Sequence, residues 1–211
     1  MRIPIAKEGY IFIIPLLMMT ILNYFLSFYW ITFVFGLSFL FVTCFFRDPE
    51  RHIPDEPNVV VSPADGKVTE IVAEKEPING EMCKRVTIFL SVFNVHVNRV
   101  PIGGTIEKIS YNSGKFLAAF NPKASMDNEQ NTILINNGKV NVVVKQIAGL
   151  IARRIVCWPN KGDHYEPGQR YGLIRFGSRV DILLPENTKL SVACGERVSG
   201  GQSIIGYLNP S

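Results

Sequence analysis

The chain has 211 residues, a formal net charge of +4 and 47% hydrophobic residues, a length that suits one globular domain with an appendage. Its positive charge is spread along the chain rather than gathered in one basic segment, which argues against a nucleic-acid partner. The four cysteines stand far apart, with no C-x-x-C pair and no histidine at metal-ligand spacing. The sequence therefore predicts neither a disulfide framework nor a metal site.

Residues 9–46 contain no charged side chain and are mostly aliphatic or aromatic, which is typical of a membrane segment. The run is longer than the ~20 residues that cross a bilayer as one helix. Asn23 and Ser27 divide it into two apolar arms, and Pro15 weakens the first arm. We therefore expect residues 1–47 to form a helical membrane hairpin, either spanning or re-entrant. A buried helix pair inside a soluble fold is the alternative.

The charges that flank this apolar run predict its orientation. Arg2 and Lys7 precede the run, and Arg47 and Arg51 follow it. A hairpin returns the chain to its starting side, so the positive-inside rule puts both ends in the cytoplasm. We expect a cell-membrane protein whose second domain, residues 48–211, lies on the cytoplasmic side.

After a polar, proline-rich linker at residues 48–57, short apolar runs alternate with Gly, Asn and Pro, which is typical of an all-β domain. The segment Asn136-Asn137-Gly138 between two apolar runs indicates a tight hairpin. The fold class is mainly β, a small barrel or sandwich behind a helical hairpin. We expect strands at residues 59–61, 66–73, 85–90, 95–100, 104–111, 132–135, 140–148, 151–157, 172–176, 179–184 and 189–194.

Two segments resemble pieces of the barrel sandwich found in lipoyl- and biotinyl-carrying domains. They are residues 62–68 (SPADGKV) and residues 195–206 (GERVSGGQSIIG). A membrane-anchored carrier or binding module is therefore a rival interpretation. It would require a modified Lys at an exposed hairpin tip, and no Lys in this chain has that setting.

The three histidines differ in setting. His52 lies in the linker and His164 in a turn-rich loop. His96 lies in a predicted strand, where alternation puts it on the same face as Asn94 and Asn98. Taken alone, this pattern is more typical of a satisfied structural histidine than of a catalytic one. A zinc peptidase would need a His-x-His pair, and Asn98 stands at the second position.

Asp65 alone indicates a turn, and Gly177-Ser178 is the only Gly-Ser dipeptide in the chain. In combination with their surroundings these residues are far more specific. From about residue 47 to residue 208 the chain resembles the short-form phosphatidylserine decarboxylases. The resemblance rests on four spaced motifs in one order: residues 62–66 (SPADG), 89–99 (FLSVFNVHVNR), 114–129 (GKF, then KAS and NE) and 176–178 (FGS).

The resemblance implies that the chain is a proenzyme that cuts itself between Gly177 and Ser178. Ser178 would attack the carbonyl of Gly177, with His96 as the base and Asp65 orienting and supporting the imidazole. Elimination and hydrolysis would leave a pyruvoyl group derived from Ser178. The products would be a β chain of residues 1–177 and an α chain of residues 178–211.

The resemblance also implies the reaction, in which phosphatidylserine becomes phosphatidylethanolamine and CO2 through a Schiff base to the pyruvoyl cofactor. His96 is the expected proton donor to the carbanion. Longer members of the family carry a second histidine three residues after the first, and this chain has Arg99 there. His96 is therefore expected to serve both cleavage and decarboxylation.

The expected partners are a phospholipid membrane, the α and β chains of one precursor, and a second copy in a homodimer. The segment around residues 115–126 mixes apolar residues with two lysines, which suits a loop at the lipid interface. A surface loop folded over the core is the alternative. A related lipid such as archaetidylserine is an alternative substrate. The candidate substrate contacts are Lys115, Phe116, Lys123 and Asn128.

Overall fold

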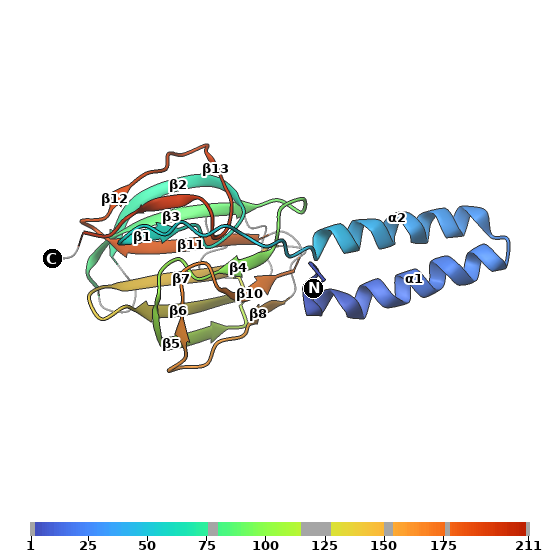
Figure 1. Cartoon of the computed structure of the whole chain (residues 1–211), viewed down its shortest axis with the longest axis horizontal. Coiled ribbons are helices and arrows are strands. Elements are labelled where there is room, and N and C mark those ends of the chain that lie inside the picture. The colour runs from blue at the N-terminus through green and yellow to red at the C-terminus, as the bar shows by residue number, and fades with distance from the viewer. Residues whose placement is uncertain (1–2, 76–79, 115–127, 150–153, 176–177, 210–211) are drawn as a thin grey trace. The chain divides into compact units, whose positions relative to one another are not determined.

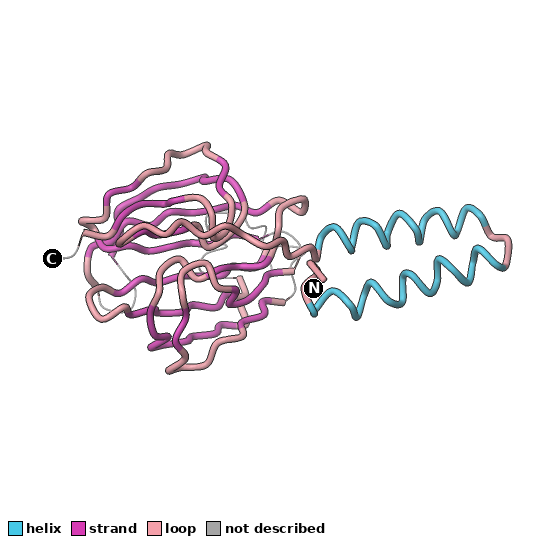
Figure 2. The backbone as a smooth tube through the Cα atoms, viewed as in Figure 1, coloured by secondary structure: helices cyan, strands magenta, loops and turns pink. Residues whose placement is uncertain are grey.

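The computed structural model describes residues 3–75, 80–114, 128–149, 154–175 and 178–209. The chain divides into two compact units, Met1–Glu50 and Arg51–Ser211. The described helices of the first unit and the described strands of the second are distinguished by colour in Figure 2. The mainly β fold with an apolar helical hairpin, expected from the sequence, is thus confirmed.

The first unit is a pair of helices. A short 3-10 helix, η1 (Lys7–Gly9), leads into α1 (Tyr10–Phe25), and α2 (Tyr29–Phe45) runs back beside it (Figure 1). The chain reverses through Ser27, whose φ of 60° is in the left-handed region. The predicted division of the apolar run into two arms is therefore confirmed.

The described part of the hairpin contains one segment that meets the length and composition of a membrane span, Lys7–Phe25. Its polar side chains bond within the helix: Thr20 Oγ1 donates to the carbonyl of Leu16, and Asn23 Nδ2 donates to that of Met19. Internal pairing of this kind lets polar groups enter an apolar medium, where unpaired ones cost several kcal/mol.

The second unit is built from antiparallel strands (Figure 1). The expected strands are present, but the one expected at 95–100 spans only Val97–Arg99, so His96 precedes it, and the last is also shorter than predicted. Three strands of two to four residues, β9, β13 and β14, were not foreseen. The described strands are β1 (Val59–Val61), β2 (Gly66–Lys75), β3 (Met82–Leu90), β4 (Val97–Arg99), β5 (Gly104–Asn112), β6 (Gln130–Asn136), β7 (Asn141–Ala148), β8 (Ile155–Cys157), β9 (His164–Tyr165), β10 (Arg170–Ile174), β11 (Ser178–Pro185), β12 (Lys189–Leu190), β13 (Arg197–Val198) and β14 (Ile204–Tyr207).

The main sheet has the order β13-β2-β3-β11-β7-β6-β5-β9 and curls into a half-barrel. Two smaller sheets, β4-β10-β8 and β1-β14-β12, complete the unit. The hairpin predicted at Asn136-Asn137-Gly138 is confirmed, because it joins β6 to β7 and Gly138 has a φ of 86°. The segments that resemble a barrel sandwich also lie together, since Val198 of β13 pairs with Gly66 of β2.

Strand β11 shows how side-chain alternation builds the core. Val180, Ile182 and Leu184 are fully buried members of the main hydrophobic cluster. On the opposite face of the strand, Arg179 and Asp181 form two hydrogen bonds of 2.7 Å. Because side chains alternate in a strand, Ser178 belongs to the same inner face as Val180.

We expect Ile182→Ala to lower the free energy of unfolding by about 2–5 kcal/mol, because it opens a cavity in a fully buried position of a central strand. Thermal and urea melts of the detergent-solubilised full chain would measure the change. Lys139→Ala, at the exposed β6–β7 turn, is the matched control and should change stability by less than about 0.5 kcal/mol. Equal stability of the two variants would contradict this packing.

Candidate functional site

Ser178 is the first residue of β11 and lies at one end of the main sheet. Its neighbours in the ladder are Leu90, the last residue of β3, and Ala148, the last residue of β7. The side chain has 0% relative exposure, and among the described residues its Oγ has no hydrogen-bond partner. A buried hydroxyl in this state costs about 1–3 kcal/mol, so its presence calls for a chemical reason.

His96 follows a tight turn that begins directly after β3. Asn94 Oδ1 accepts hydrogen bonds from the backbone N–H of Ser91 at 2.9 Å and from its hydroxyl at 2.7 Å. His96 Nδ1 lies 2.9 Å from the carbonyl oxygen of Asn94. A carbonyl only accepts, so Nδ1 carries a proton in this contact. In the neutral ring Nε2 then holds the lone pair that a base needs.

The small β4-β10-β8 sheet covers the inner face of the main sheet. Gln146 Nε2 of β7 donates to Asn98 Oδ1 of β4 at 2.9 Å, so the two layers meet here. Gly172, which pairs with Asn98, lies over the same amide, because a Cβ at Gly172 would be 3.1 Å from Gln146 Nε2. Within the main sheet, Gln146 pairs with Val180 of β11.

Two residues before Asn98 lies His96, directly before β4, and two residues before Val180 lies Ser178, the first residue of β11. The backbone N–H of Ile174 in β10 donates to the carbonyl of His96. Ile155, which pairs with Ile174, donates its N–H to Glu129 Oε1 at 3.1 Å. Glu129 in turn bonds the β7 residue that pairs with Ser178. His96 therefore lies over the end of the main sheet where β11 begins, in the layer facing Ser178.

Asp65 lies at the same end of the main sheet, directly before β2. Its carboxylate accepts two hydrogen bonds from Arg51 Nη2, at 2.8 and 3.0 Å, and one from the backbone N–H of Gly200 at 2.7 Å. Both side chains of the ion pair are largely buried. On the imidazole of His96, Nδ1 contacts the carbonyl oxygen of Asn94. The orienting role expected of Asp65 toward His96 stays a prediction.

Arg99 is a buried residue whose described contacts join neighbouring segments. Its Nη1 donates to the carbonyl of Gly168 at 2.8 Å, and its backbone N–H donates to the carbonyl of Pro63. Its side chain packs against Gly201, where a Cβ would lie 2.7 Å from the arginine Cδ. Arg99 thus ties β4 to two neighbouring turns.

Among the remaining site candidates, Asn128 is fully buried and donates from Nδ2 to the carbonyl of Ala148 at 2.7 Å, beside Ser178. This contact places Asn128 next to the ladder partner of Ser178. The other four, Gly177, Lys115, Phe116 and Lys123, lie outside the described residues.

Three buried polar residues near the site were not selected from the sequence: Asn131, Gln146 and Glu129. Asn131 Nδ2 donates to Gln146 Oε1 at 3.1 Å, and Glu129 Oε1 accepts from Tyr111 at 2.9 Å. The available signal was a polar side chain at a position where the strand pattern requires an apolar one, as at Gln146 within β7. Together with Asn98 they show that this end of the core is polar.

No cluster of His, Cys, Asp and Glu suited to a metal ion occurs among the residues that the structure describes. Cys157 lies near the site in β8, and burial raises the pKa of its thiol. The group therefore stays protonated at neutral pH.

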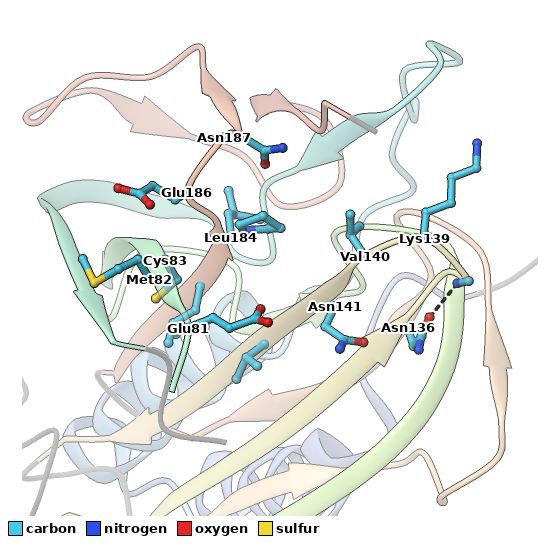
Figure 3. A pocket seen from close by; sticks show the side chains of 14 residues that line it. Glu81, Met82, Cys83, Asn136, Lys139, Val140, Asn141, Leu184, Glu186 and Asn187 are labelled. Carbon is cyan, nitrogen blue, oxygen red and sulfur yellow. Dashed lines mark hydrogen bonds between the residues drawn. The ribbon is translucent and has the colours of Figure 1, made fainter. Parts of the chain in front are cut away.

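A cavity of about 730 Å3 lies at the opposite end of the same strands (Figure 3). Its lining includes Cys83 of β3, Asn141 of β7 and Leu184 of β11. Seven residues separate the two ends of β11, which is roughly 23 Å at ~3.3 Å per residue. The cavity is therefore distinct from the Ser178 site.

Comparison with known proteins agrees with this geometry. A family model described as phosphatidylserine decarboxylase matches residues 39–206. Two similar proteins are each named phosphatidylserine decarboxylase proenzyme. The protein from Syntrophus aciditrophicus is 48% identical over 96% of both chains, and that from Desulfotalea psychrophila is 46% identical over 98% of both. A protein of the same name from Geotalea uraniireducens is 45% identical over 97% of both chains.

Proposed function

This chain belongs to the phosphatidylserine decarboxylase family, whose members are carboxy-lyases, and from that premise we propose how it matures and acts. The proposal is that it cuts itself between Gly177 and Ser178 and then converts phosphatidylserine to phosphatidylethanolamine and CO2. The observation that carries it is the buried, unpartnered hydroxyl of Ser178, beneath the layer that contains His96.

Self-cleavage begins when Ser178 Oγ adds to the carbonyl carbon of Gly177. His96 Nε2 takes the hydroxyl proton and returns it to the departing amide nitrogen, so an ester replaces the peptide bond. Loss of the Ser178 α-proton then breaks the Cβ–O bond and releases the Gly177 carboxylate. Water hydrolyses the remaining enamine, by way of its imine, with loss of ammonia, and residue 178 becomes a pyruvoyl group.

The residues around Ser178 fit a buried ketone, because the side chain is fully buried and its Oγ has no hydrogen-bond partner among the described residues. When formed, the pyruvoyl group supplies an electron sink to a substrate amine. His96, on the layer that faces residue 178, holds a proton. It delivers that proton to the substrate carbon that has lost CO2. Leu90 and Ala148 flank residue 178 in the sheet, and this enclosure keeps bulk water from competing with His96 as the proton donor.

The two chains produced by cleavage would stay together. The α chain would contain β11, which pairs along its length with β3 and from Ser178 to Leu183 with β7, both of the β chain. It would also contain β14, which pairs with β1. Maturation would remove the N–H of residue 178 alone, so the ladder pairs of the rest of β11 would remain.

Substrate and membrane contacts complete the proposal. The apolar hairpin anchors the enzyme in the cell membrane with its catalytic unit on the cytoplasmic side, and Lys115, Phe116 and Lys123 meet the lipid interface. Association as a homodimer remains part of the prediction. An archaetidylserine substrate is the second candidate, since the same headgroup is used on a different lipid backbone. The carrier-module interpretation loses its support, because the relatives are named as decarboxylase proenzymes.

Decarboxylation is tested with phosphatidylserine labelled at the headgroup carboxyl. The purified wild-type protein should release labelled CO2, whereas Ser178→Ala should release none and remain a single chain. We expect His96→Ala to slow self-cleavage by at least about 100-fold, the usual size of a general-base contribution. A His96→Ala protein that cleaved at the wild-type rate would contradict the assigned base.

A second pair of variants tests whether Asp65 supports His96 or only holds Arg51. Asp65→Asn removes the negative charge, and we expect it to slow self-cleavage by roughly 10–100-fold through loss of support for the imidazolium. Arg51→Met removes the ion-pair partner but keeps the carboxylate, and it should slow cleavage by less than about threefold. Equal slowing by the two variants would mean that Asp65 acts only through Arg51.

A further inference from the structure

Three amide side chains form a buried chain of hydrogen bonds beneath the site. Asn131 Nδ2 donates to Gln146 Oε1 at 3.1 Å, and Gln146 Nε2 donates to Asn98 Oδ1 at 2.9 Å. Their relative exposures are 2%, 0% and 0%. Hydrogen bonds of this kind offset the cost of burying polar groups.

This amide chain crosses between the two layers of the core. Asn131 and Gln146 are paired neighbours on β6 and β7 of the main sheet, whereas Asn98 belongs to β4 of the small sheet. Gly172 of β10 makes room for the crossing, because a Cβ there would lie 3.1 Å from Gln146 Nε2 and 2.2 Å from the carbonyl oxygen of Val156.

The hydrogen bond between Asn98 and Gln146 lies two residues along the strands from His96 and Ser178. Asn98 is two residues after His96, and Gln146 is two residues before Ala148, the partner of Ser178. Apolar contacts between the layers are non-directional and permit sliding. A hydrogen bond fixes both distance and angle, so the amide link sets where His96 stands over Ser178.

We propose that Asn98 and Gln146 are positioning residues for self-cleavage at Ser178, an inference that rests on the proposed function. They act through His96 by holding β4 in register with β7 and β11. Proton transfer from Ser178 Oγ requires a base within hydrogen-bond reach. A misplacement of about 1 Å can cost on the order of 100-fold in rate.

Asn98 has one further feature that agrees with a role at the site. Its Nδ2 is buried and has no hydrogen-bond partner among the described residues, as is the case for Ser178 Oγ. A residue kept only to stabilise the core would be expected to use both of its polar atoms. The donor atom of the Asn98 amide is therefore left without a partner among the described residues.

The test follows self-cleavage during cell-free synthesis of the full chain in detergent, with the precursor and both products separated on gels. Asn98→Leu and Gln146→Leu replace each amide by an apolar side chain of similar size. We expect each to slow cleavage by about 30–100-fold. The exchange variant, Asn98→Gln with Gln146→Asn, keeps an amide pair of the same total length and should recover the rate to within about tenfold of wild type.

Thr188→Val is the matched control, because Thr188 is fully buried with an unpartnered hydroxyl but follows the opposite end of β11. It should cleave at the wild-type rate. Wild-type cleavage by both leucine variants would overturn the positioning role. So would an exchange variant that melts like wild type and still cleaves as slowly as the leucine variants. Failure of the wild-type chain to cleave would instead refute the proposed function.

Discussion

The β11 ladder is the constraint on which the rest of the site depends. This strand pairs on one side with β3 over its whole length and on the other side with β7 from Ser178 to Leu183. Ser178 consequently has a ladder partner on each side, although it is the first residue of the strand. A residue at the end of a doubly paired strand has a fixed backbone position without needing a side-chain partner.

The second layer, the β4-β10-β8 sheet, adds His96 and buried polar groups to the end of the main sheet where Ser178 lies. The Ser91–Asn94 turn returns the chain from β3 to β4 and sets the His96 tautomer through the Asn94 carbonyl. The β4-β10-β8 sheet is then joined to the main sheet by hydrogen bonds at Gln146 and Glu129. Polar groups buried in a low-dielectric interior interact strongly, and they also cost most when unpaired. The core is polar at this end, where the chemistry requires it.

Much of the fold could be predicted from the sequence because it depends on local patterns. The two hairpin arms follow from the polar break at Asn23 and Ser27, and the β6–β7 turn follows from Asn136-Asn137-Gly138. The short strands β9 and β13 could not be predicted, because two residues have no period to detect. They form only because a partner strand is already present.

In the candidate site, too, residues in local motifs could be predicted from the sequence and contacts between distant segments could not. Ser178, His96 and Asp65 were selected from motifs, and the structure brings all three to one end of the main sheet. Their partners were not predictable, because contacts such as Asp65 with Arg51 and Gly200, or Gln146 with Asn98, join residues far apart in sequence. Alternation placed Asn98 on the face of His96, but only the packing of two sheets shows what it meets.

The most direct test of this account is the intact mass of the purified wild-type protein. The account predicts two chains, with the larger ending at Gly177 and the smaller carrying a pyruvoyl group in place of Ser178, so that it lacks a free amino terminus. A single chain of full mass would contradict self-cleavage. A small chain that began with an ordinary serine would contradict the proposed origin of the cofactor.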